Sequence, residues 1–124
     1  MITWPTPTLA AIAGSDDLHI SPFRADGTTY GTPTWIWSVV VDDALYVRPY
    51  NGADSRWYAS AMSQRAGRIR AAGAEHDVTF DPADPAVNDA VDAAYQTKYR
   101  GSPYLPPMLT AKTRAATVRI SPRG

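Results

Sequence analysis

The chain has 124 residues, 44% hydrophobic and 19% charged, as expected for one globular domain over residues 1–124. Twelve lysines and arginines balance twelve acidic residues, so no overall field attracts nucleic acid or a membrane surface, and we expect neither as a partner. The absence of cysteine excludes disulfides, thiolate nucleophiles and cysteine-ligated metals. The first residues lack the basic and apolar regions of a secretory signal, and no apolar run approaches the ~20 residues of a membrane span. We therefore expect a cytoplasmic protein.

A helix and a strand are predicted first in the chain. Thr8 can cap a helix over residues 8–14 and Gly14 can end it. Weak alternation of apolar and polar residues predicts a strand over 17–24, and the following Asp26-Gly27 is typical of a hairpin turn.

The most apolar segment covers residues 34–41, Thr-Trp-Ile-Trp-Ser-Val-Val-Val. Its β-branched and aromatic residues predict a central strand that is buried on both faces. Asp42-Asp43 is predicted to turn the chain without a metal ion, and a strand over 44–49 returns. Alternation along that strand separates Leu45 and Val47 on one face from Tyr46, Arg48 and Tyr50 on the other.

The second half is predicted to hold two longer helices and three strands. A helix over 55–66 precedes strands over 67–71 and 75–80. Asp84 and Pro85 are typical of the start of a helix, which runs to about residue 100 before Gly101. Its apolar stripe consists of Val87, Ala90, Val91, Ala94 and Tyr95, and after a proline-rich loop a last strand is predicted over 116–121.

About six short strands, two or three helices and turn-length connections predict a mainly β (α+β) fold. Short hairpin links require antiparallel pairing. The fold class that we expect is an antiparallel split β-barrel with flanking helices.

One segment, residues 46–70, carries five arginines against a single acid, Asp54. The strand delivers Arg48, and a glycine-containing loop leads to a helix that begins with Ser55, Arg56 and Trp57. A helix N-terminus with arginines beside it is suited to phosphate, and Trp57 or Tyr50 can lie against a planar ring.

A structural interpretation of the same segment stays equally open. Asp54 can cap the helix and occupy the N–H groups that a phosphate would need. The arginines can form a solvated helix face, and Trp57 and Tyr58 can pack in the core against Ala61 and Met62. His19 and His76 have no carboxylate at metal-binding spacing, so we expect no metal, and the common nucleotide-binding and hydrolase motifs do not occur.

The order of these segments resembles an uncharacterised bacterial family, a domain of unknown function. The resemblance covers roughly residues 14 to 122. It rests on Thr-Pro-Thr-Trp-Ile-Trp-Ser-Val-Val-Val, Leu-Tyr-Val-Arg, Gly-Ala-Asp-Ser-Arg-Trp-Tyr, Gly-Arg-Ile-Arg-Ala-Ala-Gly and Asp-Ala-Ala-Tyr-Gln-Thr-Lys-Tyr. That family looks related to the FMN-binding split barrels, including the deazaflavin-dependent nitroreductases, although this chain has Ser60 where the reductases tend to carry asparagine.

The resemblance implies an FMN or deazaflavin cofactor and, through it, an oxidoreductase activity for which no catalytic residue can be named. It places Arg48, Ser55, Arg56 and Trp57 at the phosphate site, and it extends less directly to Arg65, Arg68, Lys98 and Tyr99. In this hypothesis Trp57 and Tyr50 border the ring. A homodimer is also expected, since split barrels often pair through their sheets. The alternative is a non-catalytic small-ligand or protein-interaction module that keeps the fold without a flavin.

Overall fold

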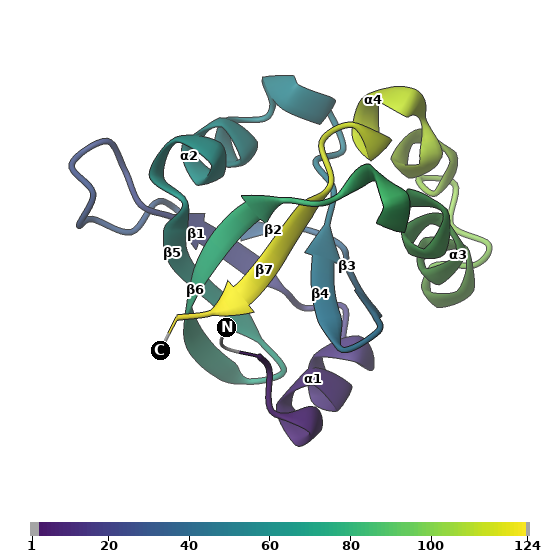
Figure 1. Cartoon of the computed structure of the whole chain (residues 1–124), viewed down its shortest axis with the longest axis horizontal. Helices are drawn as coiled ribbons and strands as arrows, with labels where there is room; N and C mark the ends of the chain where they lie inside the picture. The colour runs from purple at the N-terminus through teal and green to yellow at the C-terminus, as the bar shows by residue number, and fades with distance from the viewer. Residues whose placement is uncertain (1–2, 124) are drawn as a thin grey trace.

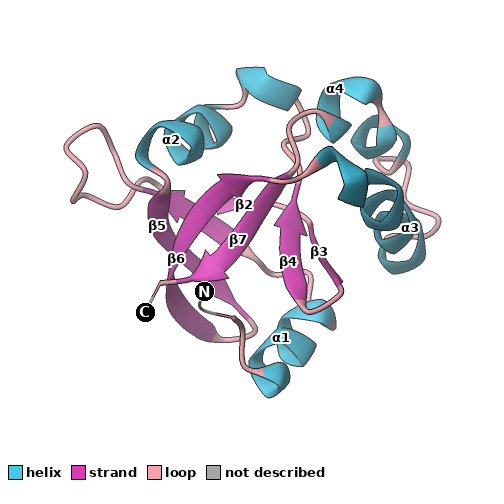
Figure 2. Cartoon of the chain, in the orientation of Figure 1, coloured by secondary structure: helices cyan, strands magenta, loops and turns pink. Residues whose placement is uncertain are grey.

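The computed structural model describes residues 3–123, and within them seven strands form one sheet in the order β2-β1-β5-β6-β7-β4-β3 (Figures 1 and 2). Every pairing is antiparallel, and the sheet curls into a half-barrel, so the predicted split-barrel class is confirmed. The strands are β1 (His19–Pro22), β2 (Thr34–Trp35), β3 (Ser38–Val41), β4 (Ala44–Val47), β5 (Ala66–Ala71), β6 (Ala74–Pro82) and β7 (Val118–Pro122). The helices are α1 (Thr6–Ala13), α2 (Arg56–Gln64), α3 (Asn88–Lys98) and α4 (Ala111–Arg114), with 3-10 turns at Gly52–Asp54, Pro85–Val87 and Pro106–Leu109.

The curl of the sheet follows from a connection of two residues. β2 and β3 form opposite edges of the sheet, yet only Ile36 and Trp37 separate them along the chain. From Trp35 to Ser38 the chain advances three residues, which span at most about 11 Å, so the edges must approach each other and the sheet must close on itself. We call this place the seam of the barrel.

The predicted central strand over 34–41 is wrong. The segment breaks into the edge strands β2 and β3, which raises the number of strands to seven, and both residues of β2 are exposed. An apolar, β-branched run is compatible with a strand at the barrel seam as well as with a central strand. At the seam, helices and loops cover the side chains that a second neighbouring strand would otherwise cover. Ile36 and Ser38 are buried there, whereas Trp35 is 55% exposed.

The interior of the barrel is filled by alternate residues of the strands, together with the N-terminal segment. Trp4 enters this core and donates its indole Nε1–H to the carbonyl oxygen of Ile120 at 2.9 Å. Leu45 and Val47 face the same interior, as predicted. The core is completed by residues that share full or nearly full burial: Leu9, Ile12, Leu18, Ile20, Ile69, Val78, Phe80 and Val118.

A second core lies outside the barrel, where α3 packs on β3 and β4 (Figure 1). Tyr46 faces α3, so the two predicted faces of β4 are confirmed and both are buried. Val91 and Tyr95, from the predicted apolar stripe, are fully buried in this second core. Met108 joins them from the 3-10 turn near the C-terminus.

Local signals placed the second hairpin turn and the start of the α3 segment correctly, whereas the cap predicted at Thr8 is wrong because Thr8 lies inside α1, which begins after Pro5. Asp42 and Asp43 both have positive φ, 49° and 64°, as a two-residue hairpin turn requires. The carboxylate of Asp84 accepts the backbone N–H of Ala86 at 2.9 Å and so caps the 3-10 turn that leads into α3. The single-turn helix α4 was not predicted. In residues 3–123 no helix has the length and apolar character to cross a membrane.

Candidate functional site

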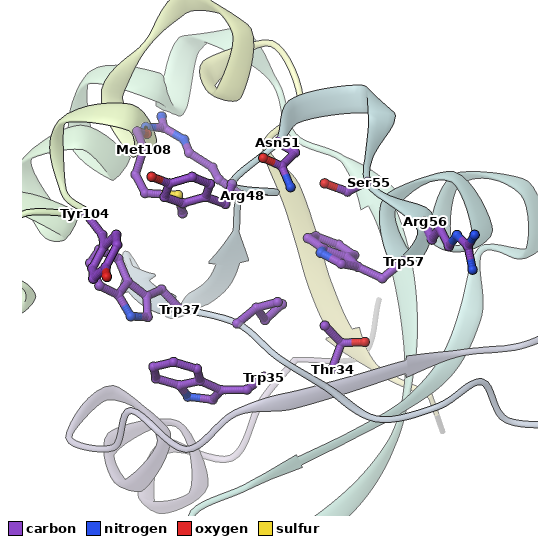
Figure 3. A pocket seen from close by; sticks show the side chains of 12 residues that line it. Thr34, Trp35, Trp37, Arg48, Asn51, Ser55, Arg56, Trp57, Tyr104 and Met108 are labelled. Carbon is purple, nitrogen blue, oxygen red and sulfur yellow. Dashed lines mark hydrogen bonds between the residues drawn. The ribbon is translucent and has the colours of Figure 1, made fainter.

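A pocket of about 710 Å³ opens at the seam of the barrel (Figure 3). Residues from four separate parts of the chain form its wall: the β2–β3 connection, the segment after β4, the start of α2, and the loops after α3. Binding cavities for small organic ligands are typically 300–1,000 Å³. The lining residues are Thr34, Trp35, Ile36, Trp37, Arg48, Tyr50, Asn51, Ser55, Arg56, Trp57, Tyr104 and Met108.

The exposed aromatic side chains of the protein gather at this pocket. Within residues 3–123, the large hydrophobic side chains that are exposed are Trp35 at 55%, Tyr50 at 48% and Tyr104 at 60%, and all three line the pocket. The rings of Tyr50 and Tyr104 meet edge-on, with centroids 6.3 Å apart. An exposed apolar cluster of this kind is typical of a binding site.

The three tryptophans of the wall are positioned by different contacts. Trp35 donates its indole N–H to the backbone carbonyl of Asp16 at 2.5 Å. Trp37 stacks on Tyr99, with ring centroids 4.0 Å apart and planes 5° from parallel. Trp57 belongs to the first turn of α2. Figure 3 shows Trp35 and Trp37 on one side of the cavity and Trp57 on the other.

The N-terminus of α2 borders the pocket. Ser55 is the residue before its first turn, and no side chain among the described residues caps it. Asp54 instead belongs to the 3-10 turn Gly52–Asp54, so the interpretation of Asp54 as the helix cap is wrong. The first backbone N–H groups of a helix have no partner within the helix, and those of Arg56, Trp57 and Tyr58 therefore remain available as hydrogen-bond donors.

Arg48 lines the pocket, but its guanidinium is bound within the protein. Its side chain is 0% exposed. Nε donates to Thr117 Oγ1 at 2.9 Å, and Nη1 donates to Asp92 Oδ1 at 2.5 Å and to the Met108 carbonyl at 2.9 Å. Nη2 donates to the carbonyl and side-chain oxygens of Asn88 at 3.3 and 3.2 Å. Every N–H of this guanidinium therefore has a protein partner, and a phosphate could bind it only by displacing one.

Arg56 differs from Arg48. It is exposed and has no ion-pair partner in the described part of the chain. In Figure 3 its guanidinium lies beyond Trp57, at the outer side of the wall. No aspartate or glutamate belongs to the wall as far as residues 3–123 define it. Because Asp92 already balances the charge of Arg48, Arg56 is the cation of the wall that makes the pocket more favourable for an anion than for a cation.

The remaining predicted site residues lie elsewhere. Arg65 follows α2 and pairs with Asp81 at 3.7 Å. Arg68 lies on β5, with its guanidinium 3.9 Å from the centroid of the Tyr30 ring. Lys98 donates to the carbonyl of Ser38 at 2.8 Å, and burial lowers its pKa. These three residues therefore lie outside the pocket. The five other predicted residues line its wall: Arg48, Tyr50, Ser55, Arg56 and Trp57.

Trp57 agrees with both interpretations of its sequence. It is partly buried and packs with Tyr58 and Met62 against the barrel core, and it also lines the pocket. Trp35, Trp37 and Tyr104 were missed. The two tryptophans looked like part of a buried strand. Tyr104 gave a signal that could have found it, an aromatic residue in a loop rich in proline and glycine.

The histidines have structural contacts. His19 Nδ1 lies 2.8 Å from the backbone oxygen of Asp17, and the His76 ring meets the edge of Trp4 at a centroid distance of 5.4 Å. Residues 3–123 contain no cluster of three histidine or acidic side chains that could hold a metal ion.

The fold and the pocket define a split-barrel protein with an aromatic pocket at the seam of its sheet. The chain belongs to an uncharacterised protein family conserved in bacteria (DUF2255), whose model matches residues 8–120. No curated protein matches the sequence closely enough to count as a relative.

Proposed function

We propose that the seam pocket binds a planar, flavin-type cofactor, FMN or a deazaflavin. The observation that carries the proposal is the gathering of all exposed large hydrophobic side chains of residues 3–123, Trp35, Tyr50 and Tyr104, around one cavity of about 710 Å³. Aromatic side chains bind planar rings through offset stacking and edge contacts. A flavin would supply hydride chemistry, and the protein would supply position and electrostatics.

The start of α2 is the part of the wall best suited to a phosphate group. Its free backbone N–H groups and the hydroxyl of Ser55 are donors, and Arg56 has no competing carboxylate. Arg48 has a different role in this proposal from the one expected from sequence. Its bonds to Met108 and Asn88 hold the wall of the pocket together. The same bonds occupy the Arg48 guanidinium, so Arg48 is not free to bind the phosphate.

A second candidate is a binding module without turnover. The observation that favours it is the absence of histidine, lysine, aspartate and glutamate from the lining that the described residues provide. Over the described residues, the wall thus lacks the side chains that most often act as general acids and bases. An oxidoreductase of the nitroreductase kind would therefore have to take protons from solvent or from a tyrosine.

Titration of the purified protein with FMN, riboflavin and a deazaflavin tests the proposal. We expect saturable binding with a Kd on the order of ten micromolar or tighter, about −7 kcal/mol. Arg56→Gln should weaken FMN binding about two- to fivefold, the usual effect of an exposed ion pair, and leave riboflavin binding unchanged because riboflavin has no phosphate. If FMN, riboflavin and the deazaflavin all fail to bind, the cofactor proposal is refuted.

The homodimer forms part of the same proposal, and its support is the exposed Trp35 on the edge strand β2. Light scattering should give twice the mass of one chain. The mass of a single chain at all concentrations would contradict the dimer without affecting the pocket.

A further inference from the structure

We propose that Trp37 is the stacking platform that selects the ligand ring, so that a bound flavin becomes the outermost layer of a continuous aromatic stack. This inference rests on the proposed flavin-type ligand. Trp37 lies outside residues 46–70, the segment that was expected to hold the phosphate site. The inference identifies the part of the pocket wall on which the ring of the ligand stacks.

The stack behind Trp37 is already formed within the protein. Trp37 lies parallel to Tyr99 at a centroid distance of 4.0 Å, and Tyr99 stacks in turn on Tyr95, at 5.9 Å and 29°. Tyr95 is 0% exposed and Tyr99 is 8% exposed. One face of the Trp37 indole is thus covered by a buried ring, while the residue also lines the pocket.

Three side chains of the α3 segment hold the backbone at Trp37 in place. The Tyr95 hydroxyl donates to the carbonyl of Trp37 at 3.4 Å. The Tyr99 hydroxyl accepts the N–H of Ser38 at 3.1 Å and donates to the Ser38 carbonyl at 3.2 Å. Lys98 donates to the same carbonyl at 2.8 Å. These bonds assign a positioning role to Lys98, which the family resemblance extended to the cofactor site less directly.

A platform fixed in this way favours a rigid planar ligand. The side-chain ordering that binding normally requires is complete before the ligand arrives, so stacking on Trp37 loses little conformational entropy. The other tryptophans are less suitable. Trp35 is 55% exposed and has no stacked ring behind it among the described residues, and Trp57 meets Tyr58 at 82°, edge-on.

Stacking of a flavin on an indole should be visible as loss of flavin fluorescence, which separates a platform from a merely structural residue. The experiment measures FMN affinity and the emission of bound FMN in the wild type, Trp37→Leu, Trp37→Phe and Trp35→Leu. We expect the wild type to quench FMN strongly. Trp37→Leu should bind FMN roughly three- to tenfold more weakly, the size of one aromatic contact, and raise the emission of bound FMN clearly above that of the wild type.

The two other variants distinguish the platform from a general loss of structure. Trp37→Phe keeps a ring on Tyr99, so its affinity should stay within about threefold of the wild type, while the quenching by the indole is lost. Trp35→Leu should retain the quenching. Emission of bound FMN in Trp37→Leu as low as in the wild type, or loss of the quenching in Trp35→Leu, would overturn the inference but leave the flavin proposal intact. Failure of the wild type to bind FMN, riboflavin and a deazaflavin would refute the proposed function itself.

Discussion

Replacement of Arg48 by alanine should destabilise the protein strongly. The substitution removes a fully buried guanidinium that joins the residue after β4 to α3, to Thr117 before β7 and to the 3-10 turn before α4. It leaves the carboxylate of Asp92, which is 23% exposed, and the carbonyl oxygens of Met108 and Asn88 without their donor. Removing one partner of a buried ion pair typically costs 3–5 kcal/mol. Asp92 keeps a second cation, Arg114 at 3.2 Å, so we expect the lower part of that range, about 3 kcal/mol.

Urea unfolding measures this loss directly. With an m value of roughly 2 kcal/mol/M for a small domain, a loss of about 3 kcal/mol lowers the midpoint by about 1.5 M. The matched control is Arg114→Ala, which removes a cation from the same network. Arg114 is 35% exposed and its other partner, Asp89, is 96% exposed. We expect a loss below about 1 kcal/mol for this variant.

Salt separates the two variants further. Screening acts on exposed charges over about 10 Å at 0.1 M ionic strength and much less on buried pairs. The destabilisation by Arg48→Ala should therefore persist at high salt, whereas the small effect of Arg114→Ala should shrink. A midpoint for Arg48→Ala within about 0.5 M of the wild type, equivalent to about 1 kcal/mol, would refute the claim that this guanidinium holds the four elements together.

Two further predictions concern the 3-10 turn Gly52–Asp54, which precedes α2, and the stability of the protein at alkaline pH. Gly52 has φ +65°, and a Cβ there would lie 2.5 Å from Lys112 Cε, so Gly52→Ala should lose about 1–3 kcal/mol. Gly73→Ala, at φ +79° with nothing within 4 Å, should lose only the backbone part, about 1 kcal/mol; equal losses in urea unfolding would show that Lys112 does not matter. Burial raises the pKa of Tyr99 from 10.0 to about 12, so the folded state keeps a proton that the unfolded chain releases. The resulting stability is complete below pH 10 and falls as the pH rises from 10.0 towards about 12. In urea unfolding across this pH range, the free energy of unfolding of Tyr99→Phe should decrease less steeply with pH than that of the wild type. An identical decrease would show that the raised pKa of Tyr99 does not contribute.

Local signals were sufficient for the hairpin turn at Asp42 and Asp43, the cap at Asp84 and the fold class, but not for the helix caps expected at Thr8 and Asp54. The cap at Asp84 and the turn at Asp42 and Asp43 depend on neighbours within three residues, so the sequence around each position specifies it. The alternation of β4 was equally reliable, because a strand places successive side chains on opposite faces whatever its partners are.

Long-range order decided the features that sequence did not reveal. Trp35 and Trp37 belong to an apolar run whose composition suits a central strand, and only the strand order shows that the run crosses from one sheet edge to the other. Arg48 looked available for phosphate because its partner Asp92 lies 44 residues away in the sequence. Tyr104 reaches the pocket only because the loop after α3 folds back over the seam.

The indole N–H signals of the four tryptophans provide the most direct test of the central claim, that the seam pocket binds a flavin-type ring. Trp35, Trp37 and Trp57 line the pocket, whereas Trp4 is buried in the barrel core with its N–H bonded to Ile120. A titration of labelled protein with FMN, followed by NMR, should shift the first three signals and leave that of Trp4 in place. Saturating FMN that leaves the three pocket signals unchanged, or that shifts Trp4 alone, would contradict the proposed site.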